Sequence, residues 1–290
     1  MQETIGWIGL GSMGHRMSRH LGNAGHPLLV ADAASTERAP KGASIAQTNA
    51  EVAVRAATIF LSLPDGVVSQ TVARELATAP DRQAKTVIDT STIGIGAAEK
   101  CANLLAASGI EYIDAPVSGG TSGADKATIA IMLACARSSF ERLEPLLRLM
   151  GKPFYVGPKP GQAQAVKVLN NFLSATALAA TSEAVAFGTE QGIDMKTILD
   201  IVNASSGRNS ATEDKFLNRI QHGRYDAGFT AKLQLKDIRL YLEAARAAGI
   251  ADQIASAVVD QWQRMEAAMP GADITDMYRY TRQRGKLERG

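Results

Sequence analysis

Lys167 is the residue whose type and surroundings best suit proton-transfer chemistry. Asn170 and Asn171 follow it at three and four residues, in a stretch rich in Ala, Leu and Val, and residues at these spacings share one face of an α-helix. A lysine whose pKa is brought towards neutrality can exchange a proton with a hydroxyl group, and an amide can hold the lysine or that hydroxyl in place. A lysine on a solvated helix face is the alternative. The apolar setting favours a buried amine and predicts catalytic roles for Lys167 and Asn171.

Three glycines form the pattern Gly-x-Gly-x-x-Gly between a strand-like run and a helical stretch. Gly9 permits a tight turn, Gly11 lets the backbone approach a pyrophosphate, and Gly14 lets the helix pack closely against the strand. Amides at the start of the helix add hydrogen-bond donors for an anion. A glycine-rich turn without a ligand is the alternative, and the position between strand and helix argues against it. The predicted dinucleotide contacts are Gly9, Leu10, Gly11, Ser12, Met13 and Gly14.

Asp32 lies at the end of the second strand-like run, 18 residues after Gly14. A carboxylate at this position accepts hydrogen bonds from the ribose hydroxyls and repels a 2′-phosphate. The first arginine beyond it is Arg38. The pattern therefore favours NAD as cofactor, with NADP as the other possibility. The alternative is that Asp32 only caps its own loop.

Ser118, Gly119 and Gly120 follow a strand-like run that ends at Asp114. Ligands of a parallel sheet collect beyond the carboxyl ends of its strands, and glycine amides together with a serine hydroxyl can surround a carboxylate. A plain connecting loop is the alternative. The sequence predicts that these three residues bind the acidic part of a substrate.

These residues need a scaffold, and the pattern predicts an α/β protein with two domains. In residues 1–160, apolar strand-like runs alternate with helical stretches, which is typical of a doubly wound, largely parallel Rossmann-type sheet. The strands are expected at 5–8, 27–31, 58–63, 86–89, 111–114, 128–134 and 153–156, and the helices at 13–24, 66–76, 96–108 and 140–150.

Residues 161–290 follow a turn-rich hinge, Gly157-Pro-Lys-Pro-Gly161, and are expected to form an all-helical substrate and oligomerisation domain joined by a long helix over 163–191. Further helices are expected at 194–203, 213–222, 232–248 and 252–268, with a charged, fraying tail from residue 278. Because the long helix is apolar on most sides, it must be covered on most sides. This predicts a homodimer or homotetramer.

Composition excludes several classes of partner. Of the 290 residues 46% are hydrophobic and 21% charged, and the net charge of +2 gives no field that would attract nucleic acid or a membrane surface. No apolar run is long enough for a membrane span. The two cysteines lack motif spacing and the four histidines lack metal-ligand spacing. We expect a cytoplasmic protein that needs no metal.

The chain resembles the β-hydroxyacid dehydrogenases, the group that includes 3-hydroxyisobutyrate dehydrogenase and tartronate semialdehyde reductase. Four motifs carry the resemblance over about residues 5 to 270, in the family's order. They are Gly9-Leu-Gly-Ser-Met-Gly14, Asp114-Ala-Pro-Val-Ser118-Gly119-Gly120, Gly161-Gln-Ala-Gln-Ala-Val-Lys167-Val-Leu-Asn170-Asn171 and Lys236-Asp237-Ile. Two positions depart from the family's pattern, since Ala163 and Ala127 stand where relatives often have glycine. Each adds a methyl group that could alter the shape of the pocket.

The resemblance implies a reaction and further site residues. It implies hydride transfer between NAD or NADP and the hydroxyl carbon of a small hydroxy-carboxylate, with Lys167 as general acid/base. It adds Leu63, Pro64 and Thr92 as cofactor contacts, and Asn170 and Asn171 as substrate contacts. Lys236 is implied to contact substrate or cofactor. An ion pair between Lys236 and the neighbouring Asp237, which we expect to support its helix start, is the alternative.

Other functions are weighed on the same residues. An NADPH-dependent semialdehyde reductase of the same family would differ mainly at Asp32. A 6-phosphogluconate dehydrogenase is disfavoured, because Asn170 and Ser174 replace that family's His and Glu. Imine reductases normally lack the lysine found here at position 167. A non-catalytic module that binds the dinucleotide would have no need of a proton-transfer group.

Overall fold

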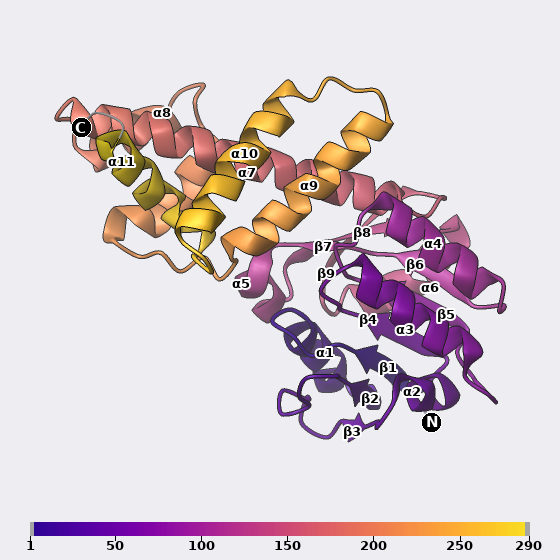
Figure 1. Cartoon of the computed structure of the whole chain (residues 1–290). Coiled ribbons are helices and arrows are strands. Elements are labelled where there is room, and N and C mark those ends of the chain that lie inside the picture. The colour runs from indigo at the N-terminus through magenta and orange to yellow at the C-terminus, as the bar shows by residue number, and fades with distance from the viewer. Residues whose placement is uncertain (1–2, 288–290) are drawn as a thin grey trace. The chain divides into compact units, whose positions relative to one another are not determined.

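The computed structural model describes residues 3–287, and the chain divides into two compact units between Lys167 and Val168. The first unit is built around a sheet whose strand order is β3-β2-β1-β4-β5-β6-β8-β7, with β9 paired to β8 (Figure 1). The strands are β1 (Ile5–Ile8), β2 (Leu28–Ala31), β3 (Ser44–Ile45), β4 (Thr58–Leu61), β5 (Thr86–Asp89), β6 (Glu111–Asp114), β7 (Val117–Ser118), β8 (Ile129–Ala134) and β9 (Gly151–Gly157). From β3 to β6 the neighbouring strands are parallel. This is the strand order of a dinucleotide-binding sheet, so the predicted fold class is confirmed.

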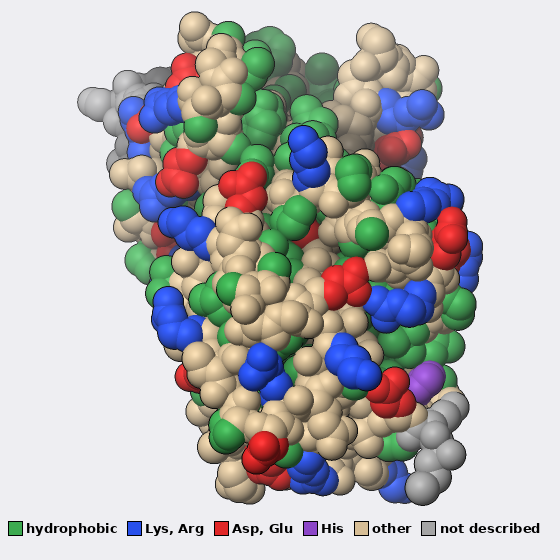
Figure 2. Space-filling model, turned by 90° about the vertical axis from the view of Figure 1, so that its right-hand side faces the viewer, with side chains coloured by type: hydrophobic (Ala, Val, Ile, Leu, Met, Phe, Trp, Pro, Cys, Tyr) green, Lys and Arg blue, Asp and Glu red, His purple; other side chains and the backbone are tan. Residues whose placement is uncertain are grey.

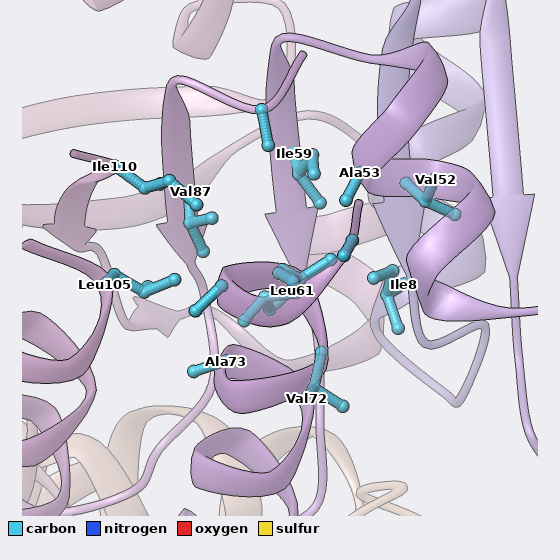
Figure 3. Packing of buried hydrophobic residues seen from close by; sticks show 14 of the residues in the cluster. Ile8, Val52, Ala53, Ile59, Leu61, Val72, Ala73, Val87, Leu105 and Ile110 are labelled. Carbon is cyan, nitrogen blue, oxygen red and sulfur yellow. The ribbon is translucent and has the colours of Figure 1, made fainter. Parts of the chain in front are cut away.

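Helices cover both faces of this sheet. They are α1 (Gly14–Asn23), α2 (Asn49–Arg55), α3 (Gly66–Thr78), α4 (Ile95–Ala106), α5 (Gly120–Asp125) and α6 (Arg137–Leu147). One core contains Ile8, Ile59 and Val87 from the strands with side chains from α2, α3 and α4 (Figure 3). The other lies on the opposite face and contains Trp7 and Phe60, stacked at 5.0 Å between ring centroids, with side chains from α1 and α6. Strands covered on both faces read as near-continuous apolar runs, which is why the sequence revealed them.

The second unit is helical and begins within the longest helix. This helix, α7 (Gln162–Glu190), is followed by α8 (Met195–Asn203), α9 (Ala231–Ala247), α10 (Gln253–Ala268) and α11 (Met277–Leu287). A π-helix (Ala211–Phe216) and two 3₁₀ turns (Ile220–His222 and Ile274–Asp276) complete it. Its core includes Phe216, Ile238, Trp262, Met265 and Met277.

The division of the chain differs from the boundary expected at residue 160. Residues up to Lys167 belong with the sheet, so the division falls inside α7. The reason is that the first turn of α7 packs on the sheet, where Ala163 is buried against Met132 and Ala134. A hinge motif marks where the chain turns, not where its packing partners change.

Two sequence predictions in the helical unit are wrong. Residues 213–222 do not form one α-helix, because a π-helix and a 3₁₀ turn occupy this stretch, and periodicity alone cannot separate these from an α-helix. The tail from Tyr278 does not fray within the described residues. It forms α11, in which Met277, Tyr278 and Tyr280 are buried. The short elements β3, α2, β7 and α5 were not predicted either.

The surface and the helices add two observations. On the face shown in Figure 2, acidic and basic side chains are interspersed and neither charge gathers in one area. Within residues 3–287, none of the helices has both the length and the apolar character needed to traverse a bilayer.

Candidate active site

The three glycines after β1 have different surroundings. A Cβ on Gly9, whose φ is +98°, would lie 2.2 Å from the carbonyl oxygen of Ser62, and a Cβ on Gly14 would lie 2.0 Å from that of Gly9. A Cβ on Gly11 would meet no heavy atom within 4 Å. Gly9 and Gly14 are therefore needed for packing, whereas Gly11 leaves an open, exposed backbone. This arrangement fits a pyrophosphate at Gly11, beside the start of α1.

Asp32 connects this loop to the end of β2. Its Oδ2 accepts a hydrogen bond from the amide of Leu10 at 2.5 Å, and its Oδ1 accepts from Ala34 and Ser35 at 2.8 and 3.0 Å. Partial burial opposes ionisation, but these backbone donors and the charge of Arg38 hold the pKa of Asp32 below its usual value. The carboxylate is thus fixed in its charged form. It does cap its own loop, and it also lines a hollow of about 320 Å³ in which a ribose could lie.

The loops after β4 and β5 bring three more predicted residues, Leu63, Pro64 and Thr92, to the same edge of the sheet. The amide of Leu63 donates to Ser91 Oγ at 2.8 Å, and Thr90 Oγ1 donates to the carbonyl of Leu61 at 2.6 Å. Thr92 follows directly and is half-buried, while Pro64 is exposed. Because β1, β2, β4 and β5 are parallel, these loops all leave from their carboxyl ends, where ligands of such sheets bind.

The predicted substrate loop forms a short strand and the start of a helix. Ser118 is half-buried in β7, and Gly119 and Gly120 are exposed at the start of α5 with φ of +136° and +63°. Positive φ favours glycine at both positions. The helix that follows is bound to α1, because Asp125 accepts from Arg16 Nε and Arg19 Nη2, both at 3.1 Å. The predicted substrate loop is therefore joined through α5 to the helix that follows the glycine loop.

Lys167 is buried, with 8% of its surface exposed, and Asn171 is buried to the same extent. Both lie on α7, one helical turn apart. The solvated helix face that was weighed against the catalytic interpretation is thereby ruled out for Lys167. The amine of Lys167 is thus withdrawn from bulk solvent, which is the setting typical of a lysine that takes part in proton transfer.

In the helical unit, one carboxylate joins two of the predicted residues. Asp237, itself buried, forms an ion pair with Lys236 through Oδ1 at 3.0 Å and accepts a hydrogen bond from Asn171 Nδ2 through Oδ2 at 2.6 Å. Gln234 Nε2 donates to the backbone carbonyl of Asn171 at 3.2 Å, and Asn170 Nδ2 donates to Asn171 Oδ1 at 3.3 Å. The ion pair considered for Lys236 is present. Asp237 does not support the start of α9, which Thr230 caps; it lies in the second turn of that helix and bonds Asn171 instead.

Comparisons with known proteins decide the family. Residues 4–157 match the family described as the NAD binding domain of 6-phosphogluconate dehydrogenase, and residues 161–281 match that described as NAD-binding of NADP-dependent 3-hydroxyisobutyrate dehydrogenase. The 2-(hydroxymethyl)glutarate dehydrogenase of Eubacterium barkeri is 33% identical over 286 residues, covering 90% of this chain and 95% of that protein. The chain belongs to the β-hydroxyacid dehydrogenase family.

Two further relatives support the same conclusion. The dehydrogenase is 34% identical to the NAD-dependent L-serine dehydrogenase of Pseudomonas aeruginosa, over 84% of this chain and 86% of that protein. The solved structure of Mycobacterium tuberculosis 3-hydroxyisobutyrate dehydrogenase with L-serine has a TM-score of 0.90 and 28% identity, covering 97% of this chain and 100% of that one. The predicted family is confirmed. The protein is an oxidoreductase that uses NAD(P) and acts on a hydroxyacid.

The two departures from the family's pattern have different structural consequences. Ala127 adopts a positive φ of +54°, a conformation that costs a residue with a side chain about 1–2 kcal/mol. Ala163 is completely buried and packs against β8. Its methyl group therefore fills the core of the dehydrogenase at the first turn of α7.

Two buried carboxylates, Asp89 and Asp114, were not singled out by sequence reasoning. They are the last residues of the neighbouring strands β5 and β6, and neither is exposed. Asp89 accepts hydrogen bonds from the Ser91 amide at 2.9 Å and from Tyr112 Oη at 3.3 Å, and burial raises its pKa. Acidic residues that directly follow the apolar centres of two strands were the available signal, since a buried carboxylate must have hydrogen-bond donors.

Asp114 should make the stability of the dehydrogenase depend on pH. Burial raises its pKa from 3.8 to about 6, against the lowering effect of its hydrogen bonds with Gln164. A raised pKa stabilises the fold below pH 3.8 and loses that contribution as the pH rises through about 6.

The expected result is a wild type that loses stability relative to Asp114→Asn between about pH 4 and pH 7, by up to about 3 kcal/mol. Urea unfolding of both proteins at matched pH measures this difference. A difference that stays constant over this range would show that Asp114 titrates normally.

Within the described residues, we also considered the two cysteines as nucleophiles and the acidic side chains as metal ligands. Burial raises the pKa of Cys101 to about 12 and that of Cys135 to about 11, so neither thiol ionises readily. No group of three or more His, Cys, Asp or Glu side chains in residues 3–287 is arranged to hold a metal ion.

Proposed function

We propose that this dehydrogenase oxidises the primary hydroxyl of a small 3-hydroxy-carboxylate, with NAD as its preferred cofactor and Lys167 as its general acid/base. The observation that carries the proposal is the burial of Lys167 on the turn of α7 that packs against the nucleotide-binding sheet. The relatives act on 2-(hydroxymethyl)glutarate, L-serine and, by name, 3-hydroxyisobutyrate. These three molecules share a hydroxymethyl group on the carbon that bears the carboxylate.

The side chains of this chain divide the work as follows. The nicotinamide cofactor supplies hydride acceptance and donation. Lys167 takes the hydroxyl proton during oxidation and returns it during reduction. Asn171, fixed by Asp237, orients the hydroxyl group. Ser118 and the amides of Gly119 and Gly120 bind the carboxylate, and Lys236 and Asn170 complete the substrate contacts.

The cofactor is held by residues of the first unit. Gly9 to Gly14 receive the pyrophosphate, with Leu10, Ser12 and Met13 lining the loop, and Leu63, Pro64 and Thr92 contact the remaining parts of the dinucleotide. The fixed charge of Asp32 and the carboxylate of Glu75, which lines the same hollow, oppose a 2′-phosphate. The positive charge of Arg38 would instead favour a 2′-phosphate. This arginine lies near enough to Asp32 to lower the pKa of its carboxyl group.

Asp32→Asn combined with Ala33→Arg should shift the preference towards NADP. The asparagine keeps one carbonyl oxygen for the amides of Ala34 and Ser35, so the loop retains its turn. Losing a hydrogen bond to a charged group costs about 1.5–3 kcal/mol, so kcat/KM for NADP relative to NAD should rise about tenfold or more. Steady-state kinetics with both cofactors measure this ratio, and an unchanged ratio would place the ribose away from Asp32.

The substrate class is tested by one assay in both directions. The purified protein is given short hydroxy acids with NAD or NADP, and the matching semialdehydes with the reduced cofactors. We expect the highest kcat/KM for acids with a hydroxymethyl group on the carbon that bears the carboxylate. Preference for NADPH and a semialdehyde would instead identify a reductase, and activity confined to secondary alcohols would contradict the proposed substrate class.

We also propose an oligomeric assembly and a cytoplasmic location, supported by the surface of α7 and by the state of the thiols. In α7, Leu169, Leu173 and Phe187 are 41%, 60% and 69% exposed in one chain, and covering them would favour a homodimer or homotetramer. We assign oligomerisation and substrate binding to the helical unit and cofactor binding to the sheet unit. Both cysteines are free and buried, which suits a reducing cytoplasm.

A further inference from the structure

Gln164 is a completely buried polar residue in the first turn of α7. Its Nε2 donates to the carbonyl oxygen of Ser91 at 3.1 Å and to Asp114 Oδ1 at 2.8 Å. Its Oε1 accepts from the amides of Ile93 and Gly94 at 2.9 and 3.1 Å. Two donors and two acceptor lone pairs are all that a side-chain amide has, so Gln164 uses its complete hydrogen-bonding capacity.

The partners of Gln164 come from two loops that the proposed reaction needs. Ser91 and Ile93 are the two neighbours of Thr92. The side-chain amide of Gln164 is therefore hydrogen-bonded to the loop after β5 on both sides of Thr92. Asp114 ends β6, in the segment that leads to Ser118, and it also receives the backbone amides of Gly161 and Gln164 at 3.0 and 3.2 Å. The start of α7 is therefore fixed to both loops through one side chain.

Lys167 lies three residues after Gln164 in the same helix, less than one turn from this attachment. A helix backbone is stiff, so a rotation or shift of its first turn is passed on to the next one. In general a displacement of about 1 Å at a reacting group can cost about 100-fold in rate.

We propose that Gln164 is a positioning residue of this dehydrogenase, which sets Lys167 against the Thr92 loop through its hydrogen bonds to Ser91, Ile93, Gly94 and Asp114. This inference rests on the proposed role of Lys167 in proton transfer.

The type of residue matters because no other side chain of this length offers the same groups. Methionine fills a similar volume but makes none of the four hydrogen bonds. Glutamate can still accept from Ile93 and Gly94, but it would bring a second carboxylate against Asp114. Burial already raises the pKa of Asp114, and a like charge beside it disfavours ionisation further. The combination of Gln164→Glu with Asp114→Asn exchanges the two groups and restores the amide–carboxylate hydrogen bond at position 114, while the carbonyl of Ser91 still loses its donor.

The experiment compares Gln164→Met, Gln164→Glu and the exchanged double variant with wild type. A matched control is Gln162→Met, since Gln162 is exposed in the same turn and its side-chain oxygen accepts from the nearby Lys159 amide, outside both loops. For each protein kcat, its pH profile, KM for substrate, the Kd for NAD and Tm are measured. We expect Gln164→Met and Gln164→Glu to lower kcat about 10–100-fold and to move the pH profile of kcat. The Kd for NAD should change less than kcat does, because Gln164 bonds the loop that carries Thr92 but not the glycine loop that receives the pyrophosphate.

Recovery of kcat in the exchanged variant, compared with the change in Tm, separates a positioning role of Gln164 from mere support of the fold. We expect it to regain at least part of the kcat lost in Gln164→Glu, and the Gln162→Met control to match wild type. The inference is overturned if folded Gln164→Met and Gln164→Glu keep wild-type kcat and pH profile, or if the loss follows Tm alone. If Gln164→Met does not fold, Gln164→Glu and the exchanged variant give the same decision. Lys167→Ala, tested in parallel, separates the two proposals: a fully active Lys167→Ala variant would overturn the proposed function itself.

Discussion

Lys167→Ala is expected to lower turnover about 10²–10⁴-fold, the usual range for loss of a general acid/base, while NAD still binds. The amine is the only group in the proposed mechanism that moves a proton, so its removal leaves the hydroxyl without a base. The glycine loop and Asp32 lie on other elements, after β1 and β2. The Kd for NAD should therefore stay within about threefold of wild type. Stopped-flow turnover and fluorescence titration with NAD measure the two quantities.

A matched control uses a lysine that the mechanism does not need. Lys159 is exposed just before α7, and Lys159→Ala should keep wild-type turnover. Exogenous short amines should restore part of the activity of Lys167→Ala but not exceed wild type. Wild-type turnover in Lys167→Ala would remove this residue from the chemistry and leave the family assignment intact.

Gly14→Ala should lower the stability of the fold, whereas Gly11→Ala should weaken NAD binding and leave stability unchanged. The added Cβ of Gly14→Ala would lie 2.0 Å from a backbone oxygen, and overpacking of this kind costs about 1–3 kcal/mol of stability. The added Cβ of Gly11→Ala meets nothing within 4 Å, so the free energy of unfolding should be unchanged.

Gly11→Ala should instead change the affinity for the cofactor. The methyl group of Gly11→Ala would stand where the pyrophosphate approaches, so the Kd for NAD should rise about tenfold or more. Urea unfolding and isothermal titration calorimetry with NAD separate the two effects. If Gly11→Ala binds NAD as wild type does, the pyrophosphate does not lie against this face of the loop.

The nucleotide-binding half was readable from the sequence because its signals are local. Strands β1, β5 and β6 begin and end at the residues expected, since each is a short apolar run between turn residues. The glycine spacing identified the loop, and the acidic residue at the end of β2 identified Asp32. The bonds made by Asp32 to Leu10, Ala34 and Ser35 could not be foreseen, because they depend on how two loops meet in space.

The network around Gln164 shows where local patterns stop being informative. Its partners Ser91, Ile93 and Asp114 lie 50 to 73 residues away along the chain, and no periodicity connects them. In the same way, Asp237 was read as a support of its helix start, although it reaches Asn171 at a separation of 66 residues. The tail was misjudged because its charged residues concealed the buried side chains of α11, and the π-helix was missed because periodicity does not separate it from an α-helix.

The division inside α7 has a consequence for recombination among relatives. The cofactor-binding half carries Ala163, Gln164 and Lys167 with it, so a chimaera joined in the Gly157–Gly161 turn would take these residues from the other parent. Such a joint would leave the carboxylate of Asp114 facing a foreign helix. A crossover placed after Lys167 keeps each half with its own partners, and shuffled libraries of this enzyme should yield their active members there.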